Sequence, residues 1–177
     1  GTAEGQVDML ASLGVTEASV GAPIRATMEV DEIGQLPNGP KLYQDRVSSS
    51  ADATLLVNRV KPHTDFHGLL ESGLTKMAVI GLGKKVGATE MHERGVAGFQ
   101  QFLTPAARIY EAHSNIVGGV AIVENAYDAT ACVQALPMSE IGQEPERQLL
   151  DQARRSMASL TFKDIDVLVV LKGPVQA

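Results

Sequence analysis

Short apolar runs alternate along this chain with segments in which apolar residues recur at helical spacing. The apolar runs cover residues 53–57, 116–125 and 166–171. Such runs are typical of strands that are buried on both faces. Between them, residues 98–113 and 144–160 have the apolar stripe of an amphipathic helix, the first interrupted near a proline and the second with a proline in its first turn. This alternation predicts an α/β fold with a mostly parallel sheet flanked by helices.

The N-terminal part of the chain predicts smaller elements. Residues 3–13 fit a short amphipathic helix, and Gly14 supplies its stop signal. Asn38-Gly39 is a strong turn signal between two segments that can pair, so we expect a small β-hairpin near the N-terminus. Further along, the pattern of residues 128–136 does not distinguish a strand from a helix.

Composition and charge exclude several classes of protein. At 177 residues the chain is long enough to bury a core of its own. The formal net charge of -6 argues against general binding to nucleic acid or to an anionic membrane, because both need a basic surface. The single cysteine, Cys132, excludes an intrachain disulfide, and its apolar neighbours predict a buried, inert thiol. Without a signal peptide or an apolar run of about 18 residues, a cytoplasmic location is the default expectation.

Chemically versatile side chains gather between residues 58 and 92. This stretch holds three of the four histidines, His63, His67 and His92, together with Lys76 and further basic residues. It begins where the first predicted strand ends, and ligands of open α/β sheets collect outside the carboxyl ends of strands. A functional site is therefore expected in this stretch.

His63 is a candidate general acid or base. Because Pro62 biases Lys61 towards an extended conformation, the approach of the chain to His63 is restricted. A loop histidine titrates near neutral pH and can move a proton, although a capping or solvated histidine would look the same in sequence. His67 competes for the same role.

Lys76 is a candidate for covalent chemistry. Ser72 fits the N-cap of a helix that begins here, and four apolar residues follow Lys76. Apolar surroundings disfavour the charged form of a lysine, and covalent chemistry needs a neutral amine. The alternative is a solvated lysine on the surface of a helix.

Three glycines, at positions 81, 83 and 87, weakly match a dinucleotide-binding fingerprint. No clear strand with a terminal acid follows about twenty residues on, where a ribose partner would lie. A glycine-rich turn between helices is the alternative, and Lys84 and Lys85 beside it are candidates for contact with a nucleotide phosphate. The spacing of the histidines does not support a zinc site, and by itself His92 would be assigned to the surface.

Three features of the stretch together resemble the nickel-dependent lactate racemase family. They are Pro62-His63, Ser72-Gly73-x-x-Lys76, and a histidine sixteen residues beyond that lysine, His92. The amino-acid sequence around them resembles the sequences of a subgroup of the family more than that of lactate racemase itself. The resemblance extends over nearly the whole chain. The spacing from the lysine to the second histidine is its most specific part.

The resemblance implies an isomerase that racemises or epimerises a 2-hydroxy acid by proton-coupled hydride transfer to a nickel-pincer nucleotide. Lys76 would be joined to this cofactor through a thioamide, with Ser72 and Gly73 in the cofactor-binding motif. His92 would be the protein ligand of nickel, and His63 one of two catalytic histidines. The sulfur, carbon and sulfur donors of the pincer leave one in-plane position on square-planar nickel, which an imidazole suits.

The resemblance also implies a division of the chain. Residues 1–160 would form the central part of the cofactor-binding catalytic domain, and residues 161–177 the first strand of a following α/β unit. The second catalytic histidine and a substrate-binding arginine would lie upstream of Gly1, and further active-site residues beyond Ala177. We therefore expect a fragment of a two-domain protein that supplies part of an active site and is inactive by itself.

Three questions stay open at this point. A non-catalytic metal- or nucleotide-binding module of the same fold is one alternative function, and a nicotinamide-dependent oxidoreductase that uses the three glycines is a weaker one. The connection between His63 and Ser72 is longer than in lactate racemase, so His67 is the alternative base. The substrate is expected to be a small hydroxy acid whose identity depends on contacts outside this chain.

Overall fold

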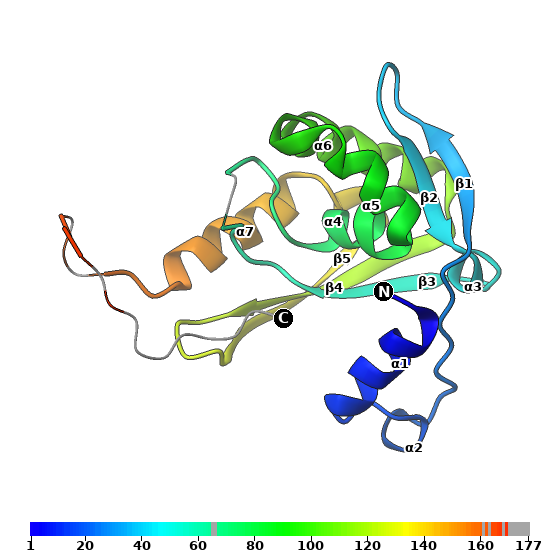
Figure 1. The fold of residues 1–177 in the computed structure, drawn as a ribbon, viewed down its shortest axis with the longest axis horizontal. Coiled ribbons are helices and arrows are strands. Elements are labelled where there is room, and N and C mark those ends of the chain that lie inside the picture. The colour runs from blue at the N-terminus through cyan, green and yellow to red at the C-terminus, as the bar shows by residue number, and fades with distance from the viewer. Residues whose placement is uncertain (65–66, 161, 163, 168, 170–177) are drawn as a thin grey trace.

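Helices pack on one face of a small sheet, and a separate hairpin lies at its side (Figure 1). The computed structural model describes residues 1–64, 67–160, 162, 164–167 and 169. The strands are β1 (Val30–Gln35), β2 (Lys41–Asp45), β3 (Thr54–Arg59), β4 (Ile116–Glu124) and β5 (Thr130–Pro137). The helices are α1 (Ala3–Ser12), α2 (Glu17–Val20), α3 (Arg46–Ser49), α4 (Leu74–Lys76), α5 (Lys84–His92), α6 (Gly95–His113) and α7 (Glu144–Ser156), with a π-helical segment η1 (Met77–Leu82) and a 3₁₀ turn η2 (Met138–Glu140).

The main sheet has the order β3-β4-β5 in the described part of the chain. β3 and β4 are parallel, and the helices α4 to α6 connect them. β5 returns antiparallel to β4 through a tight turn, in which the Asn125 N–H donates to Ala129 O at 2.9 Å. The α/β class is confirmed, but a mostly parallel sheet is not, because most of the ambiguous residues 128–136 belong to β5, which pairs antiparallel with β4.

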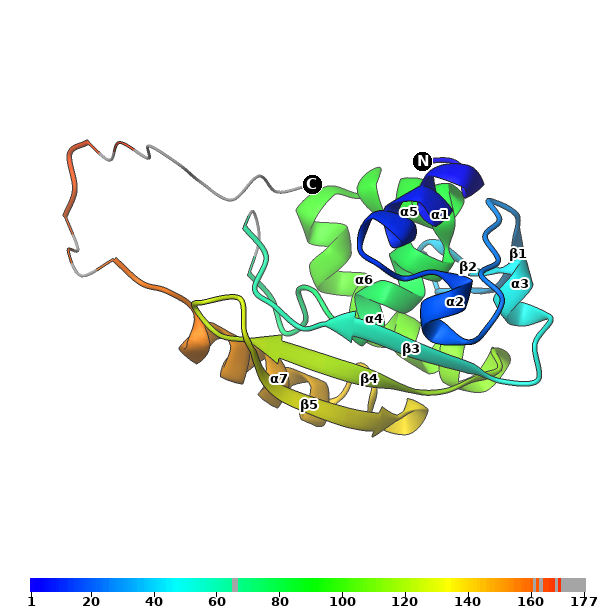
Figure 2. The ribbon, with the colours of Figure 1, turned by 90° about the horizontal axis from the view of Figure 1, so that it is seen from below.

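The two faces of the main sheet have different surroundings. Helices α4 to α7 lie on one face, as Figure 2 shows from below, whereas Leu55 and Val57 on the other face are 58% and 57% exposed. Leu56, between them, is 3% exposed and belongs to the core. The prediction that this strand is buried on both faces is therefore wrong for one face, because an apolar run in sequence does not say how many layers cover it.

The core over the inner face comes mainly from α6 and α7. Their buried apolar side chains are Phe99, Phe102, Leu103, Ala106, Ala107 and Tyr110 on α6 and Leu149, Leu150 and Ala153 on α7. α6 runs without a break through Pro105, so the predicted interruption is wrong. Pro105 is exposed, and its ring is tolerated on the outer side of a helix whose inner side is held by packing.

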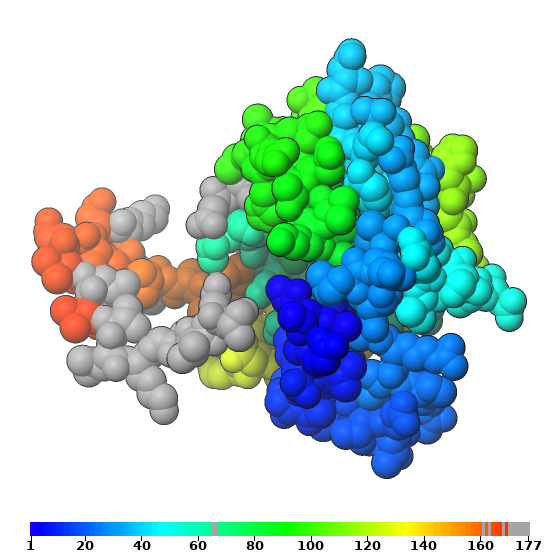
Figure 3. All heavy atoms as spheres, turned by 45° about the vertical axis from the view of Figure 1, so that its right-hand side comes forward, coloured from blue at the N-terminus to red at the C-terminus, as the bar shows by residue number. Residues whose placement is uncertain are grey.

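Several predicted boundaries also change. α7 ends at Ser156 rather than at residue 160. None of the residues of α1 is buried, so the predicted apolar face of residues 3–13 does not enter the core. Together α1 and α2 form a lobe at the lower edge of the molecule (Figure 3). Cys132 is half-buried and packs against the core. The predicted strand 166–171 and the unit 161–177 lie largely outside the described residues.

The predicted N-terminal hairpin is confirmed. β1 and β2 pair antiparallel around the Asn38-Gly39 turn, where Asn38 has φ 51°. Asparagine tolerates this left-handed conformation better than most residues, which explains the turn signal. Another glycine brings a helix close to the main sheet: a Cβ at Gly119 of β4 would lie 2.8 Å from Leu74 at the start of α4. The short helix that carries Lys76 therefore rests directly on the sheet.

Candidate functional site

A pocket of about 690 Å³ lies at the carboxyl ends of β3 and β4. The ends of both strands, the segments that follow them, the last residue of α4 and the residues after α7 line it. The lining residues are Arg59, Lys61, Pro62, His63, Thr64, Ser72, Lys76, Glu124, Asn125, Ala126, Asp128, Met157 and Ala158. Open α/β sheets bind ligands at this edge, as the position of the stretch 58–92 predicted. His63, Ser72 and Lys76 thus share one pocket.

The loop that carries His63 is organised around a buried carboxylate. At its neck, the Lys61 N–H donates to Ser72 O at 3.2 Å in an isolated antiparallel bridge. Inside, Glu71 is 1% exposed and accepts hydrogen bonds from the backbone N–H groups of His63, at 2.7 Å, and Gly68, at 3.1 Å. The backbone at His63 is therefore held by the protein rather than by solvent.

His67 is placed differently from His63. Its side chain is 81% exposed, and its Nδ1 lies 3.4 Å from Glu71 Oε1. Its carbonyl oxygen accepts a hydrogen bond from the side chain of Gln100 at 2.7 Å. Within the described residues, the pocket lining includes His63 but not His67. Of the two histidines, His63 is therefore the one placed to contact a ligand in the pocket.

Lys76 is half-buried at the end of α4. Burial lowers the pKa of its amine below the usual value, and the nearby charge of Lys61 lowers it further. Its Nζ lies 5.5 Å from the centre of the Phe99 ring. Because a lowered pKa leaves more neutral amine at a given pH, Lys76 has the surroundings expected of a lysine that forms a covalent bond.

The start of α4 differs from the prediction. Ser72 is not the N-cap; Gly73 holds that position, without a side-chain cap. The buried Glu146 of α7 serves instead, since its carboxylate accepts hydrogen bonds from the Thr75 N–H at 3.0 Å and the Thr75 hydroxyl at 2.6 Å. A Cβ at Gly73 would lie 2.5 Å from Glu146 Oε1, so a glycine is needed to admit the carboxylate.

The glycine motif after Lys76 has a packing explanation. A Cβ at Gly83 would lie 2.2 Å from Val79 O, and one at Gly87 would lie 2.8 Å from the same oxygen. These glycines therefore let η1 and α5 approach each other. A dinucleotide fingerprint follows a strand, whereas the segment before Gly83 is the π-helix η1. Short π-helical segments occur often at functional sites, and this one begins directly after Lys76.

Lys84 and Lys85 stand apart from the pocket in the described part of the chain. The Lys84 ammonium lies 3.3 Å from the Asp45 carboxylate and donates to the Gln6 side chain at 2.8 Å. Its φ of 52° marks the junction between η1 and α5. Lys84 thus ties α5 to β2 and α1, while Lys85 is exposed.

His92 is the last residue of α5, and its side chain is exposed. Its ring lies edge-on to Phe99, with 5.1 Å between the ring centres. Phe99 therefore contacts both His92 and Lys76. Among the residues described, His92 is not in the pocket lining, and no three His, Cys, Asp or Glu side chains are grouped so as to hold a metal ion.

Several residues of the site were missed from sequence. Asn125 and Asp128, in the turn after β4, line the pocket; the rule that ligands gather at the carboxyl ends of strands could have found them. The buried acids Glu71 and Glu146 have no such signal, because their burial depends on contacts with remote segments. Arg59 also lines the pocket, where it is ion-paired with Glu124 at 3.0 Å.

Two further findings bear on the class of protein. No helix in the described part of the chain is long and apolar enough to cross a membrane. Comparisons with family models, with curated proteins and with solved structures find no match to this chain.

Proposed function

We propose that this chain is part of a 2-hydroxyacid racemase or epimerase that works by proton-coupled hydride transfer with a nickel-pincer nucleotide. The supporting observation is the relation between three residues. His63 and Lys76 line one pocket, and Lys76 and His92 both contact the ring of Phe99. The residues that the family resemblance links to proton transfer, cofactor attachment and nickel binding are thus connected through Lys76 and its surroundings.

The side chains present fit such a cofactor. The Lys76 amine is half-buried and has a lowered pKa, which favours its acylation. The ring of Phe99, which lies near the Lys76 amine, also contacts His92, and the imidazole of His92 is exposed. Since no three metal-binding side chains gather in the described residues, a metal at this site would need donors from a bound group as well. His92 would be the side chain that supplies an imidazole to the nickel of such a group.

When bound, the cofactor supplies an acceptor for the hydride of the substrate. His63 would be one of the two histidines that the resemblance implies for proton transfer. For one enantiomer it would accept the proton of the substrate hydroxyl, and it would give a proton back to the keto oxygen when that enantiomer forms again. Lys61 attracts the substrate carboxylate, whereas Arg59 is already paired with Glu124. A pocket of about 690 Å³ has room for a small hydroxy acid beside a nucleotide. We also propose that the protein acts in the cytoplasm.

Mass spectrometry and nickel analysis of the full-length protein, co-produced with the cofactor-making enzymes, test the assignment of Lys76 and His92. We expect a covalent adduct on Lys76 that is lost in Lys76→Arg and kept in Lys85→Arg, the exposed control. Bound nickel should fall in His92→Ala and stay unchanged in His113→Ala, a second exposed histidine. Wild-type protein without adduct, or nickel binding unaffected by His92→Ala, would contradict the proposal.

Racemisation assays with a panel of 2-hydroxy acids then test His63. We expect His63→Ala to abolish interconversion of the enantiomers and His67→Ala to keep most of it; the reverse result would move the base to His67. An adduct without racemisation of any substrate would favour the non-catalytic binding module. Reversible dinucleotide binding without nickel would favour the oxidoreductase.

A further inference from the structure

We infer that helix α7 positions the two reactive groups of the pocket separately, Lys76 through Glu146 and His63 through Arg154 and Glu71. Their roles as positioning residues rest on the proposed function, which gives Lys76 and His63 their chemistry. The two reactive residues belong to one segment of the chain, but the side chains that hold this segment come from a helix about 70 to 90 residues later.

Glu146 holds the turn that leads into Lys76. This carboxylate is 1% exposed and accepts three hydrogen bonds: from the Thr75 N–H at 3.0 Å, the Thr75 hydroxyl at 2.6 Å and the Gly142 N–H at 2.8 Å. Two of its donors belong to the residue next to Lys76. Any shift of Glu146 would therefore be transmitted to the backbone of α4, on which the position of the amine depends.

Arg154 and Glu71 hold the loop that carries His63. One nitrogen of the Arg154 guanidinium donates to Glu71 Oε1 at 2.6 Å and to Gly68 O at 3.0 Å. Glu71 in turn accepts the His63 N–H at 2.7 Å. The arginine also donates to Asp151 on its own helix, at 2.8 Å, which fixes its side chain against α7. The chain of contacts thus runs without a gap from α7 to the backbone of His63.

The geometry of α7 makes it a suitable support. Glu146 and Arg154 are eight residues apart, about 12 Å along a helix axis, so each reaches a different part of the segment. Between them Leu149, Leu150 and Ala153 are each at most 2% exposed. This buried stripe anchors α7 in the core, so the helix cannot follow movements of the loop.

The two contacts predict two separable effects, which residue-resolved labelling can measure in the free protein. Carbethoxylation of His63 and reductive methylation of Lys76 are followed by mass spectrometry. We expect Arg154→Gln to change the His63 rate by roughly threefold to tenfold and to leave Lys76 nearly unchanged. Arg154→Lys, which keeps the charge, should restore part of the His63 rate. Glu146→Gln should change the Lys76 rate in the same range and leave His63 nearly unchanged.

Matched controls on the same helix are Arg155→Gln and Glu144→Gln, whose side chains are exposed and lie outside the pocket. Circular dichroism and thermal unfolding report whether each variant keeps its fold; if Glu146→Gln unfolds, the Arg154 variants still test the His63 arm. Equal changes at both residues, or no change at either, would overturn the inference. Because both rates are measured without cofactor, a missing adduct on Lys76 would count against the proposed function and not against the role of α7.

Discussion

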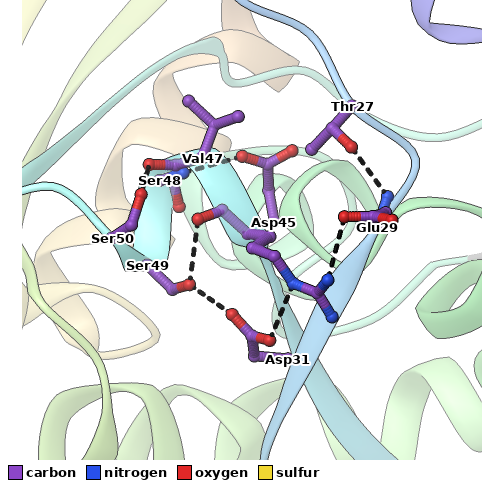
Figure 4. A network of polar contacts seen from close by, with 9 residues as sticks. Thr27, Glu29, Asp31, Asp45, Val47, Ser48, Ser49 and Ser50 are labelled. Carbon is purple, nitrogen blue, oxygen red and sulfur yellow. Dashed lines mark hydrogen bonds and ion pairs between the residues drawn. The ribbon is translucent and has the colours of Figure 1, made fainter.

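The acids that support the segment of His63 and Lys76 and the acids of the hairpin both accept close contacts from an arginine or a backbone N–H, but the first are buried and the second are exposed. Behind His63, Glu71 has a side chain with no exposed surface and lies 2.6 Å from Arg154. At the base of the hairpin, Arg46 lies 2.9 Å from Glu29 and 3.2 Å from Asp31, but these side chains are between 44% and 66% exposed. Figure 4 shows Glu29, Asp31 and the neighbouring serines of this hairpin network.

The comparison shows that contact distance does not measure the value of an ion pair. A side chain of the hairpin network that loses its partner is solvated by the water already around it, so little free energy is lost. A buried carboxylate that loses a donor, or a buried N–H that loses its carboxylate, has no such replacement. The following variants test that difference, from the largest expected effect to the smallest.

Glu146→Ala is expected to have the largest effect. It leaves the buried N–H groups of Thr75 and Gly142 and the Thr75 hydroxyl without their acceptor. We expect the free energy of unfolding, measured in urea, to fall by about 3 kcal/mol. Glu144→Ala, two positions earlier and exposed, should change it by about 0.5 kcal/mol or less. A loss below about 1 kcal/mol in Glu146→Ala would mean that the buried cap is replaceable.

Glu71→Gln should lower the free energy of unfolding by about 2 kcal/mol near pH 7. The size of this loss should depend on pH. Burial raises the pKa of Glu71, but hydrogen bonds from the His63 N–H, Arg154 and Gly68 together bring it below the usual 4.5. The ionised form therefore stabilises the fold above the unfolded pKa, and this contribution is lost as the pH falls through the lower folded pKa. The gap between wild type and Glu71→Gln in urea unfolding should be constant above about pH 5.5 and narrow below it.

Asp31→Asn is the matched test in the hairpin network. The hydrogen bond from Ser49 lowers the pKa of Asp31 as well, but the side chain of Asp31 is 44% exposed. We expect a small difference from wild type at every pH. A gap for Glu71→Gln that stays the same down to pH values far below 4.5 would show that the charge of Glu71 does not stabilise the fold.

Lys61→Met should have a smaller effect, which appears in the reactivity of Lys76 rather than in the stability of the fold. Burial is the larger cause of the lowered pKa of Lys76, and the charge of Lys61 lowers it further. Removal of that charge should raise the pKa of Lys76 towards its usual value without restoring it, because burial remains. The pH dependence of reductive methylation at Lys76 measures the change, with Lys85→Met as the control. A profile that does not move would exclude coupling between the two lysines.

Arg46→Gln is expected to have the smallest effect. Its two ion pairs are exposed, so the free energy of unfolding should fall by less than about 1 kcal/mol at low salt. The remaining difference should disappear at about 0.5 M salt, where the screening length is only a few ångströms. A loss as large as that of Glu71→Gln would remove the distinction between the two networks.

The sequence predicted the local elements better than their arrangement. The Asn38-Gly39 hairpin, the apolar strand that ends at Arg59 and the helix that begins beside Pro145 follow from turn chemistry and periodicity, which are properties of neighbouring residues. The direction of β5 and the open face beside Leu55 did not follow. They depend on which segments pair and pack, and no local pattern records this.

The candidate site divides in the same way. The pocket position of His63, Ser72 and Lys76 agrees with the rule for the ends of strands, and the lowered pKa of Lys76 agrees with its apolar neighbours in sequence. The cap at Ser72 was wrong because a remote carboxylate, Glu146, meets the helix start instead. The chemical roles of His63, Lys76 and His92 remain proposals for the experiments above.

By itself, the sequence determined that histidines and lysines gather after a strand and that Gly73 lies three residues before Lys76. Only the tertiary structure decided that Glu146 and Arg154 of α7 hold this segment, that Glu71 is buried within it, and that Phe99 contacts both Lys76 and His92. The physical reason is the range of the interactions. Turns and periodicity act over a few residues, whereas burial of a charge is set by every segment that packs around it.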